Sequence, residues 1–317
     1  MKKLLLLILL MGSAATVFLY DYAINQPLKI SEDTLFLVNK GDSLNKIAQS
    51  LQDKELVNDK YIFILFSKIN KIYPQIKAGE YLFNGEFSVK QTAEKLSSGK
   101  VYLRKVTFPE GLTSTEIAKI LHKENFLSKD EFAAPAEGSI LPETYAYMRG
   151  DSPEKIIKQA QKAMQNVLEQ AWQERDQNLP LQSKEELLIL ASIVEKETGI
   201  GMERAQVASV FVNRLRLGML LQTDPTVIYA LTNGKEDLNR PLTRKDLSID
   251  SPYNTYKYAG LPPTPICNPG KDAIYAAAHP SETPYLYFVA SGNGGHNFAT
   301  TLSEHNENVR KWRELNK

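Results

Sequence analysis

The stretch LLILASIVEKETG, residues 187–199, decides how the larger part of this chain folds. Seven of its first eight residues are apolar, which predicts a helix buried in a core. Ser183 and Glu186, three residues apart just before it, form the pattern of a capping box. The stretch ends on two glutamates, Glu195 and Glu197, on either side of a lysine. The sequence therefore predicts a buried helix that carries carboxylates in its last turn.

Helical geometry separates these two glutamates. Each residue advances about 100° around a helix. Glu197 then lies about 50° from the centre of the apolar face, and Glu195 lies about 105° from it. Burial and the helix macrodipole both raise the pKa of a carboxyl group at the position of Glu197, and such a group can act as a general acid. The alternative is a solvated helix end, and for Glu195 this is the simpler interpretation.

A second carboxyl group is needed by most glycosidases, which flank the scissile bond with two. Asp224 also has a structural interpretation, as the cap of a helix that starts at Pro225. One mechanism needs a single glutamate: the sugar's own 6-hydroxyl attacks the anomeric carbon, and the tethered nucleophile supplies the proximity advantage. The candidates for a second carboxyl group are Asp224, Glu143, Glu137 and Glu203.

Three loops offer groups that suit a sugar cleft. They are residues 221–229, 253–265 and 291–301, and they are rich in Gln, Asn, Thr, His and Tyr. Such side chains hydrogen-bond hydroxyl and acetamido groups, while tyrosine rings stack on sugar rings. The same residue types are common in ordinary turns, so the loops alone do not assign a function.

Metal and nucleophile chemistry find little support. The four histidines form no HExxH motif and no pair at ligand spacing on one helix. Ser192 lies outside any GxSxG motif, and Cys267, the only cysteine, precedes an Asn-Pro-Gly turn. We therefore expect no metal site and no cofactor.

The N-terminus predicts a membrane anchor. Lys2 and Lys3 precede 17 uncharged residues, 4–20, which is the short end of the ~17–25 residues that span a bilayer. The lysines should stay in the cytoplasm, with the rest of the chain outside. The alternative is a signal peptide cleaved near residues 13–15, which would leave apolar residues 17–20 at the mature end. A retained anchor is the preferred interpretation.

Length and charge bound the rest. The chain has 317 residues, enough for two modest domains and an anchor. Its 38 basic and 37 acidic residues leave a net charge of +1, which argues against a nucleic-acid partner. We expect an α+β protein with a cytoplasmic stub and transmembrane helix at 1–21, a tether at 22–34, a small α+β module at 35–102 and a larger helix-rich domain at 103–317.

The small module shows a strand–turn–helix pattern. A strand at 35–38, a turn at 40–42 and a helix capped by Ser43 are followed by a strand at 79–83 and a helix at 88–96. The segment KGDSLNKIAQSL resembles LysM-type wall-binding modules. With the preceding Asn included, NKGDSLNKIAQSL also matches PEGLTSTEIAKIL, which lies 70 residues downstream. Either a duplication or a common local pattern explains this match.

The larger domain should be mostly helical. Helices are predicted at 153–174 and 203–217 and after two Asx-Pro pairs, with Asp224 and Asn268 as caps. A hairpin should follow, with a strand at 285–290, a turn at 291–295 and a returning strand at 296–301. Thr301 and Glu304 form a capping box for the last helix.

Four long segments carry a specific resemblance. They are LASIVEKET, ERAQVASVFVNRLRLGMLLQTDPTVIYAL, YNTYKYAGLPPTPICNPG and HPSETPYLYFVASGNGGHNFATTLSEHN. They resemble the endolytic murein transglycosylase family, the YceG-like proteins also called MltG, over about residues 103–310. The resemblance implies a single-pass anchor in the cell inner membrane, with the catalytic domain on its periplasmic or extracytoplasmic side. It also implies cleavage of MurNAc–GlcNAc β-1,4 bonds in nascent peptidoglycan strands, which leaves 1,6-anhydroMurNAc ends and limits strand elongation.

The resemblance also implies site residues and partners. The catalytic glutamate is the second of the EKET motif, Glu197, in agreement with the helical-face argument. A PDTY-like motif of the family reads Pro-Glu-Thr-Tyr here, and the exchange of Asp for Glu weakens a role for residue 143. Peptidoglycan strands are the substrate, and peptidoglycan synthases are the implied protein partners. The substrate-binding candidates are Glu143, Tyr145, Gln222, Thr223, Asp224, Asn254, Thr255, Tyr256, His296 and Asn297.

Two other functions stay open. A non-catalytic scaffold would use the LysM-like module to hold glycan and the larger domain to recruit synthases. An ordinary hydrolase would use Glu197 together with Glu143 or Asp224, and water would supply an oxygen atom to its product.

Overall fold

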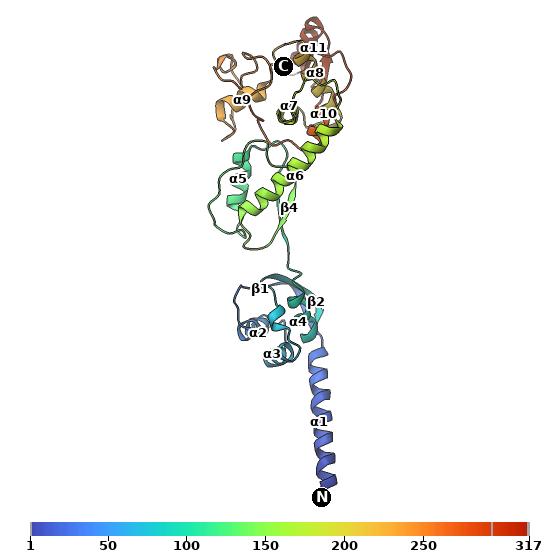
Figure 1. Cartoon of the computed structure of the whole chain (residues 1–317). Coiled ribbons are helices and arrows are strands. Elements are labelled where there is room, and N and C mark those ends of the chain that lie inside the picture. Colours follow the sequence, from blue (N-terminus) through green and yellow to red (C-terminus); the bar gives the residue numbers. More distant parts are fainter. Residues whose placement is uncertain (1, 293, 316–317) are drawn as a thin grey trace. The chain divides into compact units, whose positions relative to one another are not determined.

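The computed structural model describes residues 2–292 and 294–315 and has mixed α+β architecture (Figure 1). The chain divides into two compact units. Unit 1 comprises Met1–Arg104 with Tyr147–Gly150, and unit 2 comprises Lys105–Ala146 with Asp151–Lys317. All strands in the described residues belong to two-stranded sheets, pairing β1 with β2, β3 with β4 and β5 with β6. The α+β class predicted from the sequence is confirmed.

Unit 1 is built on one antiparallel strand pair. Val38 of β1 pairs with Gly79 of β2, and Leu28 pairs with Phe87 at the other end of the pair. The elements of the unit are α1 (Lys2–Asn25), β1 (Leu28–Val38), α2 (Leu44–Asp53), α3 (Lys60–Ile69), the short 3-10 helix η1 (Tyr73–Gln75), β2 (Gly79–Phe87) and α4 (Val89–Ser98).

The core of unit 1 lies between this sheet and its helices. Phe36 and Phe83 from the strands and Phe63 from α3 are fully buried together. Ser43 caps α2 by accepting a hydrogen bond from the Lys46 N–H, as the sequence predicts. Helix α3 was not predicted, although Asp59 caps it in the same way.

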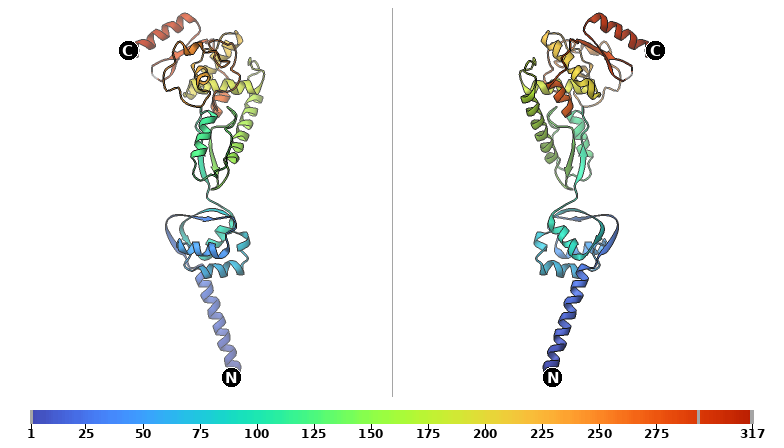
Figure 2. Two further views of the ribbon diagram at one scale, coloured as in Figure 1. Left: turned by 90° about the vertical axis from the view of Figure 1, so that its left-hand side faces the viewer. Right: turned by 90° about the vertical axis from the view of Figure 1, so that its right-hand side faces the viewer.

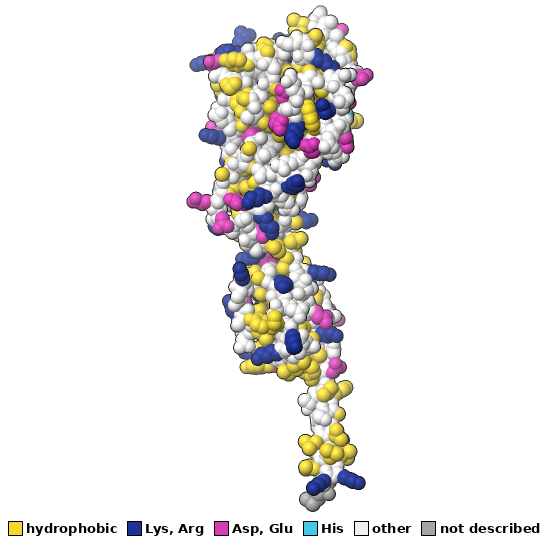
Figure 3. Space-filling model, viewed as in Figure 1, with side chains coloured by type: hydrophobic (Ala, Val, Ile, Leu, Met, Phe, Trp, Pro, Cys, Tyr) yellow, Lys and Arg dark blue, Asp and Glu magenta, His cyan; other side chains and the backbone are white. Residues whose placement is uncertain are grey.

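The predicted tether at 22–34 is wrong as a structural description. Helix α1 continues to Asn25 and strand β1 begins at Leu28, so two residues separate them. The physical reason is burial: Ile24 and Ile30 both pack into the core of unit 1, which orders the segment. The apolar side chains along the rest of α1 are exposed (Figure 3). Among the described residues α1 is the one helix that by length and composition could cross a membrane, a test that signal sequences also pass.

Unit 2 holds the predicted helices and hairpin. Strands β3 and β4 carry the chain across the boundary between the units, at Arg104 and Tyr147. The elements are β3 (Arg104–Thr107), α5 (Ser114–Lys123), β4 (Thr144–Tyr147), α6 (Pro153–Glu174), α7 (Lys184–Glu197), the short 3-10 helix η2 (Gly201–Glu203), α8 (Arg204–Arg216), α9 (Asp224–Thr232), the short 3-10 helix η3 (Asp246–Ser248), α10 (Lys271–Ala278), β5 (Tyr287–Ala290), β6 (His296–Ala299) and α11 (Leu302–Leu315).

Helix α7 is the centre of unit 2. Leu187, Leu190, Ile193 and Val194 have no exposed surface, and α7 packs against α6, α8 and α10. Burying a leucine or isoleucine side chain contributes about 1.5–3 kcal/mol, so this contact set fixes α7 in place. The apolar stretch that begins at Leu187 therefore forms the innermost helix of the unit.

The hairpin formed by β5 and β6 is confirmed. Tyr287 pairs with Ala299 and Ala290 pairs with His296. Asn293, within the predicted turn, lies outside the described residues. Helix α11, red in Figure 2, contacts both strands. Its capping box is also confirmed, because the Thr301 N–H donates to Glu304 and the Glu304 N–H donates to Thr301.

Two predicted helix caps are wrong. Thr223, not Asp224, precedes α9, and Asp224 is its first helical residue. Gly270, not Asn268, precedes α10. The Asn268 side chain is buried instead, donating to the Leu112 carbonyl and accepting from the Ile140 N–H. In both cases the polar side chain bonds a group that is distant in sequence, Tyr256 for Asp224 and Leu112 for Asn268, and not the helix terminus.

Candidate functional site

Glu197 is the last residue of α7 and is half-buried. Thr223 Oγ1 donates a short hydrogen bond to Glu197 Oε1. Burial raises the pKa of Glu197 to about 7, and the negative charge of Asp224 adds to the rise. The Thr223 hydrogen bond and the proximity of His296 act in the opposite direction. Near neutral pH this carboxyl group exists in both protonation states, as a group that donates and accepts a proton must.

Glu197 opens into a groove of about 470 Å³. Its walls come from α7, α8, α9, α11, the hairpin and the loops beside them. The lining residues are Glu197, Phe211, Arg214, Leu221, Gln222, Asp224, Tyr256, Tyr287, Phe288, Val289, Leu302, His305 and Val309. Of the predicted site residues, Gln222, Asp224 and Tyr256 therefore share this groove with Glu197.

A cluster of buried threonines positions the partner of Glu197. The Thr223 N–H donates to Thr255 Oγ1 at 3.1 Å, and the hydroxyl groups of Thr226 and Thr255 lie 2.8 Å apart. Thr226 Oγ1 also donates to the Thr223 carbonyl at 2.7 Å. These hydrogen bonds fix both the N–H and the carbonyl group of Thr223, and its hydroxyl points at the Glu197 carboxyl group. Thr223 and Thr255 were predicted to bind substrate, and the structure buries both.

Gln222 occupies a left-handed backbone conformation with φ of 53°. A residue other than glycine adopts this conformation only where its surroundings hold it there. Here the Gln222 N–H donates to the Thr255 carbonyl at 3.1 Å, and Arg214 Nη1 donates to Gln222 Oε1 at 3.2 Å. The arrangement places a glutamine amide on the wall of the groove.

Asp224 and Tyr256 form a pair in the same wall. The Tyr256 hydroxyl donates to Asp224 Oδ1 at 2.6 Å. Burial and the Asp224 carboxylate raise the pKa of Tyr256, so the phenol stays protonated. A neutral phenol beside a carboxylate offers both a ring face and hydrogen-bonding groups to a sugar.

Three other predicted contacts do not line the groove. Asn254 is fully buried, and its Nδ2 donates to the carbonyl groups of Leu247 and Ile249. Tyr145 is buried, and its hydroxyl donates to the Leu141 carbonyl at 2.7 Å. Glu143 is exposed on the polypeptide segment before Tyr145. Asn254 and Tyr145 therefore hold loops in shape.

His296 and Asn297 lie on strand β6. His296 Nδ1 is 2.7 Å from Glu203 Oε2, and the His296 N–H donates to Glu203 Oε1 at 3.1 Å. This contact uses Glu203, one of the candidate second carboxyl groups. Asn297 pairs with Val289 across the hairpin and is not part of the groove lining. His296 lies close enough to Glu197 to lower its pKa.

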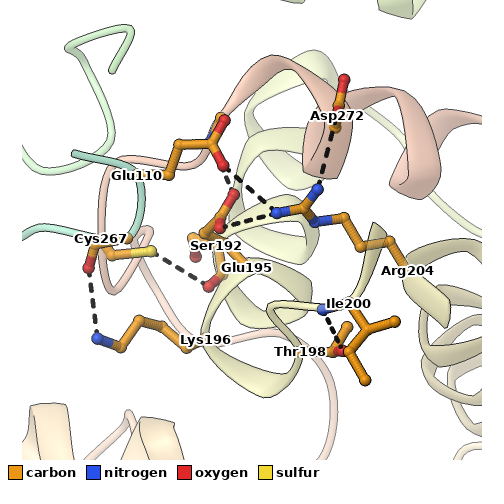
Figure 4. A network of polar contacts seen from close by, with 11 residues as sticks. Glu110, Ser192, Glu195, Lys196, Thr198, Ile200, Arg204, Cys267 and Asp272 are labelled. Atoms are coloured by element: carbon orange, nitrogen blue, oxygen red, sulfur yellow. Dashed lines mark hydrogen bonds and ion pairs between the residues drawn. The ribbon is translucent and has the colours of Figure 1, made fainter. Parts of the chain in front are cut away.

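Glu195 is not the solvated residue that the sequence suggested. Its side chain is only 6 % exposed, and its Oε2 accepts a hydrogen bond from the Gly270 N–H at 2.9 Å. Arg204 Nη2 lies 3.6 Å from Glu195 Oε1 (Figure 4). The same guanidinium group also pairs with Glu110 at 3.3 Å and with Asp272 at 3.6 Å. Burial raises the pKa of Glu195.

The rest of the α7 terminus is fixed in the same region. Lys196 Nζ donates to the Gly111 carbonyl at 3.3 Å. Thr198 closes the helix, since its N–H donates to the Val194 carbonyl and its hydroxyl accepts from the Ile200 N–H. Lys196 is thus anchored in another segment and Thr198 at the end of its own helix, while Glu197 between them lines the groove.

The rejected nucleophiles are buried. Ser192 Oγ donates to the Ile189 carbonyl at 2.7 Å, and the Cys267 thiol donates to the Ser192 carbonyl at 3.3 Å (Figure 4). Burial raises the pKa of the Cys267 thiol well above its usual range. Within residues 2–292 and 294–315, no group of three or more His, Cys, Asp and Glu side chains is arranged to hold a metal ion.

Several residues that line the groove were not predicted from the sequence. Arg214 follows Val207 and Phe211 at helical spacing, so it lies on the buried face of α8. A charged residue at such a position is a signal that could have been used. Tyr287, His305 and Val309 gave no signal, because their place in the groove depends on how α11 packs on the hairpin.

Comparison with known proteins identifies the family of the chain. The sequence profile of the YceG-like family matches residues 36–311. The chain belongs to the YceG-like family.

Named relatives cover most of the chain. A protein of Bacillus subtilis (strain 168) named endolytic murein transglycosylase is 34% identical over 338 residues, which cover 96% of this chain and 91% of that protein. A protein of the same name from Streptococcus pneumoniae (strain D39) is 30% identical, covering 96% of this chain and 63% of that protein. A crystal structure of a yceG-like protein from Listeria monocytogenes is 32% identical, with a TM-score of 0.53, and the match covers 87% of this chain and 98% of that chain.

Proposed function

We propose that this chain cleaves the β-1,4 bond between MurNAc and GlcNAc within nascent peptidoglycan strands, with Glu197 as its catalytic residue. The broad activity, that of a lytic murein transglycosylase, follows from the family and from relatives that carry this name. The bond, the catalytic residue and a role in limiting strand elongation are the parts that we propose. The observation that supports them most directly is the carboxyl group of Glu197, whose pKa burial raises to about 7, facing a polar groove.

The proposed reaction uses Glu197 twice. The protonated carboxyl group gives its proton to the glycosidic oxygen, and the bond from C1 of MurNAc to that oxygen breaks. The 6-hydroxyl of the same MurNAc then attacks C1, and the Glu197 carboxylate takes the hydroxyl proton. The products are a free GlcNAc 4-hydroxyl and a 1,6-anhydroMurNAc end, so atoms and protons balance without water.

The surroundings of Glu197 suit both steps. Burial favours the protonated form that the first step needs. The hydrogen bond from Thr223 favours the ionised form that appears between the steps, since a donor stabilises a carboxylate. Holding the sugar's hydroxyl next to C1 supplies the entropic advantage of an intramolecular attack.

A hydrolase that uses Asp224 is the second candidate. Asp224 lines the same groove as Glu197, and its negative charge raises the pKa of Glu197. Two carboxyl groups in one groove suit hydrolysis as well. Glu143 is a weaker partner, since it is exposed and not part of the groove lining.

One experiment separates these functions. Purified nascent strands are digested with the wild-type chain and with Glu197→Gln in water enriched in oxygen-18, and the products are analysed by mass spectrometry. We expect anhydro ends without oxygen-18 from the wild type, and a rate at least about 100-fold lower from Glu197→Gln. Reducing ends that carry oxygen-18 would support hydrolysis. Undiminished cleavage by Glu197→Gln would remove Glu197 from the mechanism.

The cellular setting is part of the proposal. An apolar helix at the N-terminus is consistent with a single-pass membrane anchor. We propose that α1 spans the inner membrane with both units on its outer side, and that peptidoglycan synthases are partners. We also propose that the LysM-like segment of unit 1 binds glycan, which a pull-down of that unit with insoluble peptidoglycan tests.

A further inference from the structure

Arg214 is a buried cation in the wall of the groove. The residue is 7% exposed and projects from α8 toward the loop that follows it. Its Nε donates to the Leu286 carbonyl at 2.7 Å, and its Nη1 donates to the carbonyl groups of Leu220 and Leu221, each at 3.0 Å. Its fourth acceptor is Gln222 Oε1. All four acceptors are neutral, and among the described residues no carboxylate forms an ion pair with Arg214.

A buried guanidinium group without a carboxylate partner is costly, because its charge has left water without a counter-charge. Burial accordingly lowers the pKa of Arg214. Compare Arg204 on the same helix, which is surrounded by three carboxylates. An anion from outside the chain that binds to Arg214 would offset the free-energy cost of its burial.

One nitrogen of Arg214 is available to such an anion. Within the described residues, Nε and Nη1 have partners and Nη2 has none. Nη2 is not fully buried. Arg214 is one of the residues that line the groove, so its guanidinium group borders the space that a ligand would occupy.

Two ring side chains lie beside Arg214 in this part of the groove. The guanidinium group lies 5.1 Å from the centre of the Tyr287 ring, and His305 stacks on the same ring. Burial and the charge of Arg214 lower the pKa of His305, which keeps its ring neutral. The Asp224 carboxylate is engaged by the Tyr256 hydroxyl. Arg214 therefore provides a positive charge in the wall of the groove that Glu197 also lines.

We propose that Arg214, through Nη2, binds a carboxylate of the substrate on its MurNAc side: a carboxylate of the stem peptide where the peptide is attached, or the lactyl carboxylate where the peptide has been removed. This inference rests on the proposed function, since both carboxylates belong to peptidoglycan and GlcNAc carries none. Arg214 would thus distinguish the two sugars of the alternating strand and set which glycosidic bond lies at Glu197. A charged hydrogen bond of this kind contributes enough to change affinity by about tenfold or more.

The test changes the ligand first and the protein second. Full-length chain in detergent is given two pairs of strands. The first pair carries stem peptides with free or amidated carboxylates. The second pair has been stripped of peptides and carries lactyl groups that are free or methyl-esterified. KM and kcat for release of anhydro ends are measured for wild type, Arg214→Lys, Arg214→Met and Arg216→Met. Arg216 is the matched control, because it lies on α8 but is exposed and not part of this groove lining.

We expect wild type and Arg216→Met to show a KM about tenfold lower for the free carboxylate in one of the two pairs, which identifies the source. Arg214→Met should lose this difference, and Arg214→Lys should keep part of it because it keeps the charge. Equal KM values for free and neutralised ligands with wild type would overturn the subsite while leaving the function intact. Persistence of the difference in Arg214→Met would overturn it as well. Cleavage of none of the strands by wild type would contradict the proposed function itself.

If Arg214→Met does not fold, the wild-type comparison and Arg214→Lys still decide. A purely structural role for Arg214 would lower activity on free and neutralised strands alike. Only a contact with the ligand makes the ratio of the two KM values depend on residue 214.

Discussion

Glu197 unites two properties that rarely occur in one glutamate. It ends a helix whose other residues form the centre of a core, and it faces a groove lined with polar groups. Burial explains its proton affinity, and the contacts of its neighbours explain its direction. A carboxyl group in this position changes protonation state close to neutral pH, with consequences that can be measured.

The pH dependence of cleavage should follow Glu197. The first step needs the protonated carboxyl group, whose pKa is raised to about 7. The value of kcat/KM should therefore be highest below pH 7 and fall about tenfold for each further unit above it, because the protonated fraction falls in that proportion. Initial rates between pH 5 and 9 measure this. A profile that rises through pH 7 would mean that Glu197 acts first as a base.

Thr223 should set where that fall begins. Its hydroxyl donates to the carboxylate, so Thr223→Val removes a contact that favours the ionised form and moves the midpoint of the pH profile upward. Valine has nearly the same shape, which limits other changes. Thr232→Val is the control, because that hydroxyl bonds the Ile228 carbonyl within α9. An unchanged midpoint in Thr223→Val would show that the contact is absent during catalysis.

The position of Glu197 at the edge of the apolar face could be predicted from the sequence, but its neighbours could not. The helical period alone places Glu197 at the edge of the apolar face. The burial of Glu195 depends on Gly270, which precedes α10, and on Arg204 of α8. Side chains such as Asn254 and Tyr145 look like sugar contacts by type, and the structure uses them to bond the backbone. Local pattern indicates residue type, whereas exposure depends on tertiary contacts.

At the scale of elements, the end of α7 is held by segments from three parts of the chain. Arg204 at the start of α8 joins Glu195 to Glu110, which precedes α5, and to Asp272 of α10. A Cβ atom at Gly270 would collide with the Glu110 carboxylate, so a larger residue there would require Glu110 to move away from its pairing with Arg204. The position of the end of α7, which carries Glu197, therefore depends on these contacts.

Arg204→Met should destabilise unit 2 strongly. It leaves the Glu195 carboxylate buried without its counter-charge, and breaking such a pair costs about 3–5 kcal/mol. Chemical denaturation followed by circular dichroism measures the loss. Adding Glu195→Gln should recover part of it, because the amide needs no counter-charge. Lys184→Met is the control: its partner Glu169 and the lysine are each about half exposed, and the loss should be under about 1 kcal/mol.

Regular elements followed from their own sequences. The bounds of α6 match the predicted range, and the caps Ser43, Thr301 and Ser183 lie where the patterns place them. The caps assigned to Asp224 and Asn268 failed because each side chain bonds a group far away in sequence. Helix α3 was not predicted, although Phe63, Phe66 and Ser67 are buried at helical spacing along it.

At the scale of the whole molecule, the chain is two compact units with distinct cores. The match to the YceG-like family extends over both, from residue 36 to residue 311. The sequence predicted the anchor and two folded parts. It predicted a tether where the structure has the last turn of α1 and the first half of β1.

Two truncations should behave differently. Removing residues 1–19 keeps Tyr20 and Ile24, which pack on the core of unit 1, and should leave its stability unchanged. Removing residues 1–27 also removes Ile24 and should destabilise that unit by about 2–5 kcal/mol, as other deletions of buried aliphatic groups do. Denaturation midpoints of both proteins measure the difference. Equal midpoints would show that the end of α1 contributes nothing to the fold.

The burial of Ile24 has a consequence for where the protein works. If the apolar part of α1 lies in lipid, unit 1 begins within a turn or two of the lipid headgroups, without a flexible linker in between. A module mounted in this way samples only the thin layer next to the bilayer, where new chains emerge, and mature wall farther out stays beyond its reach.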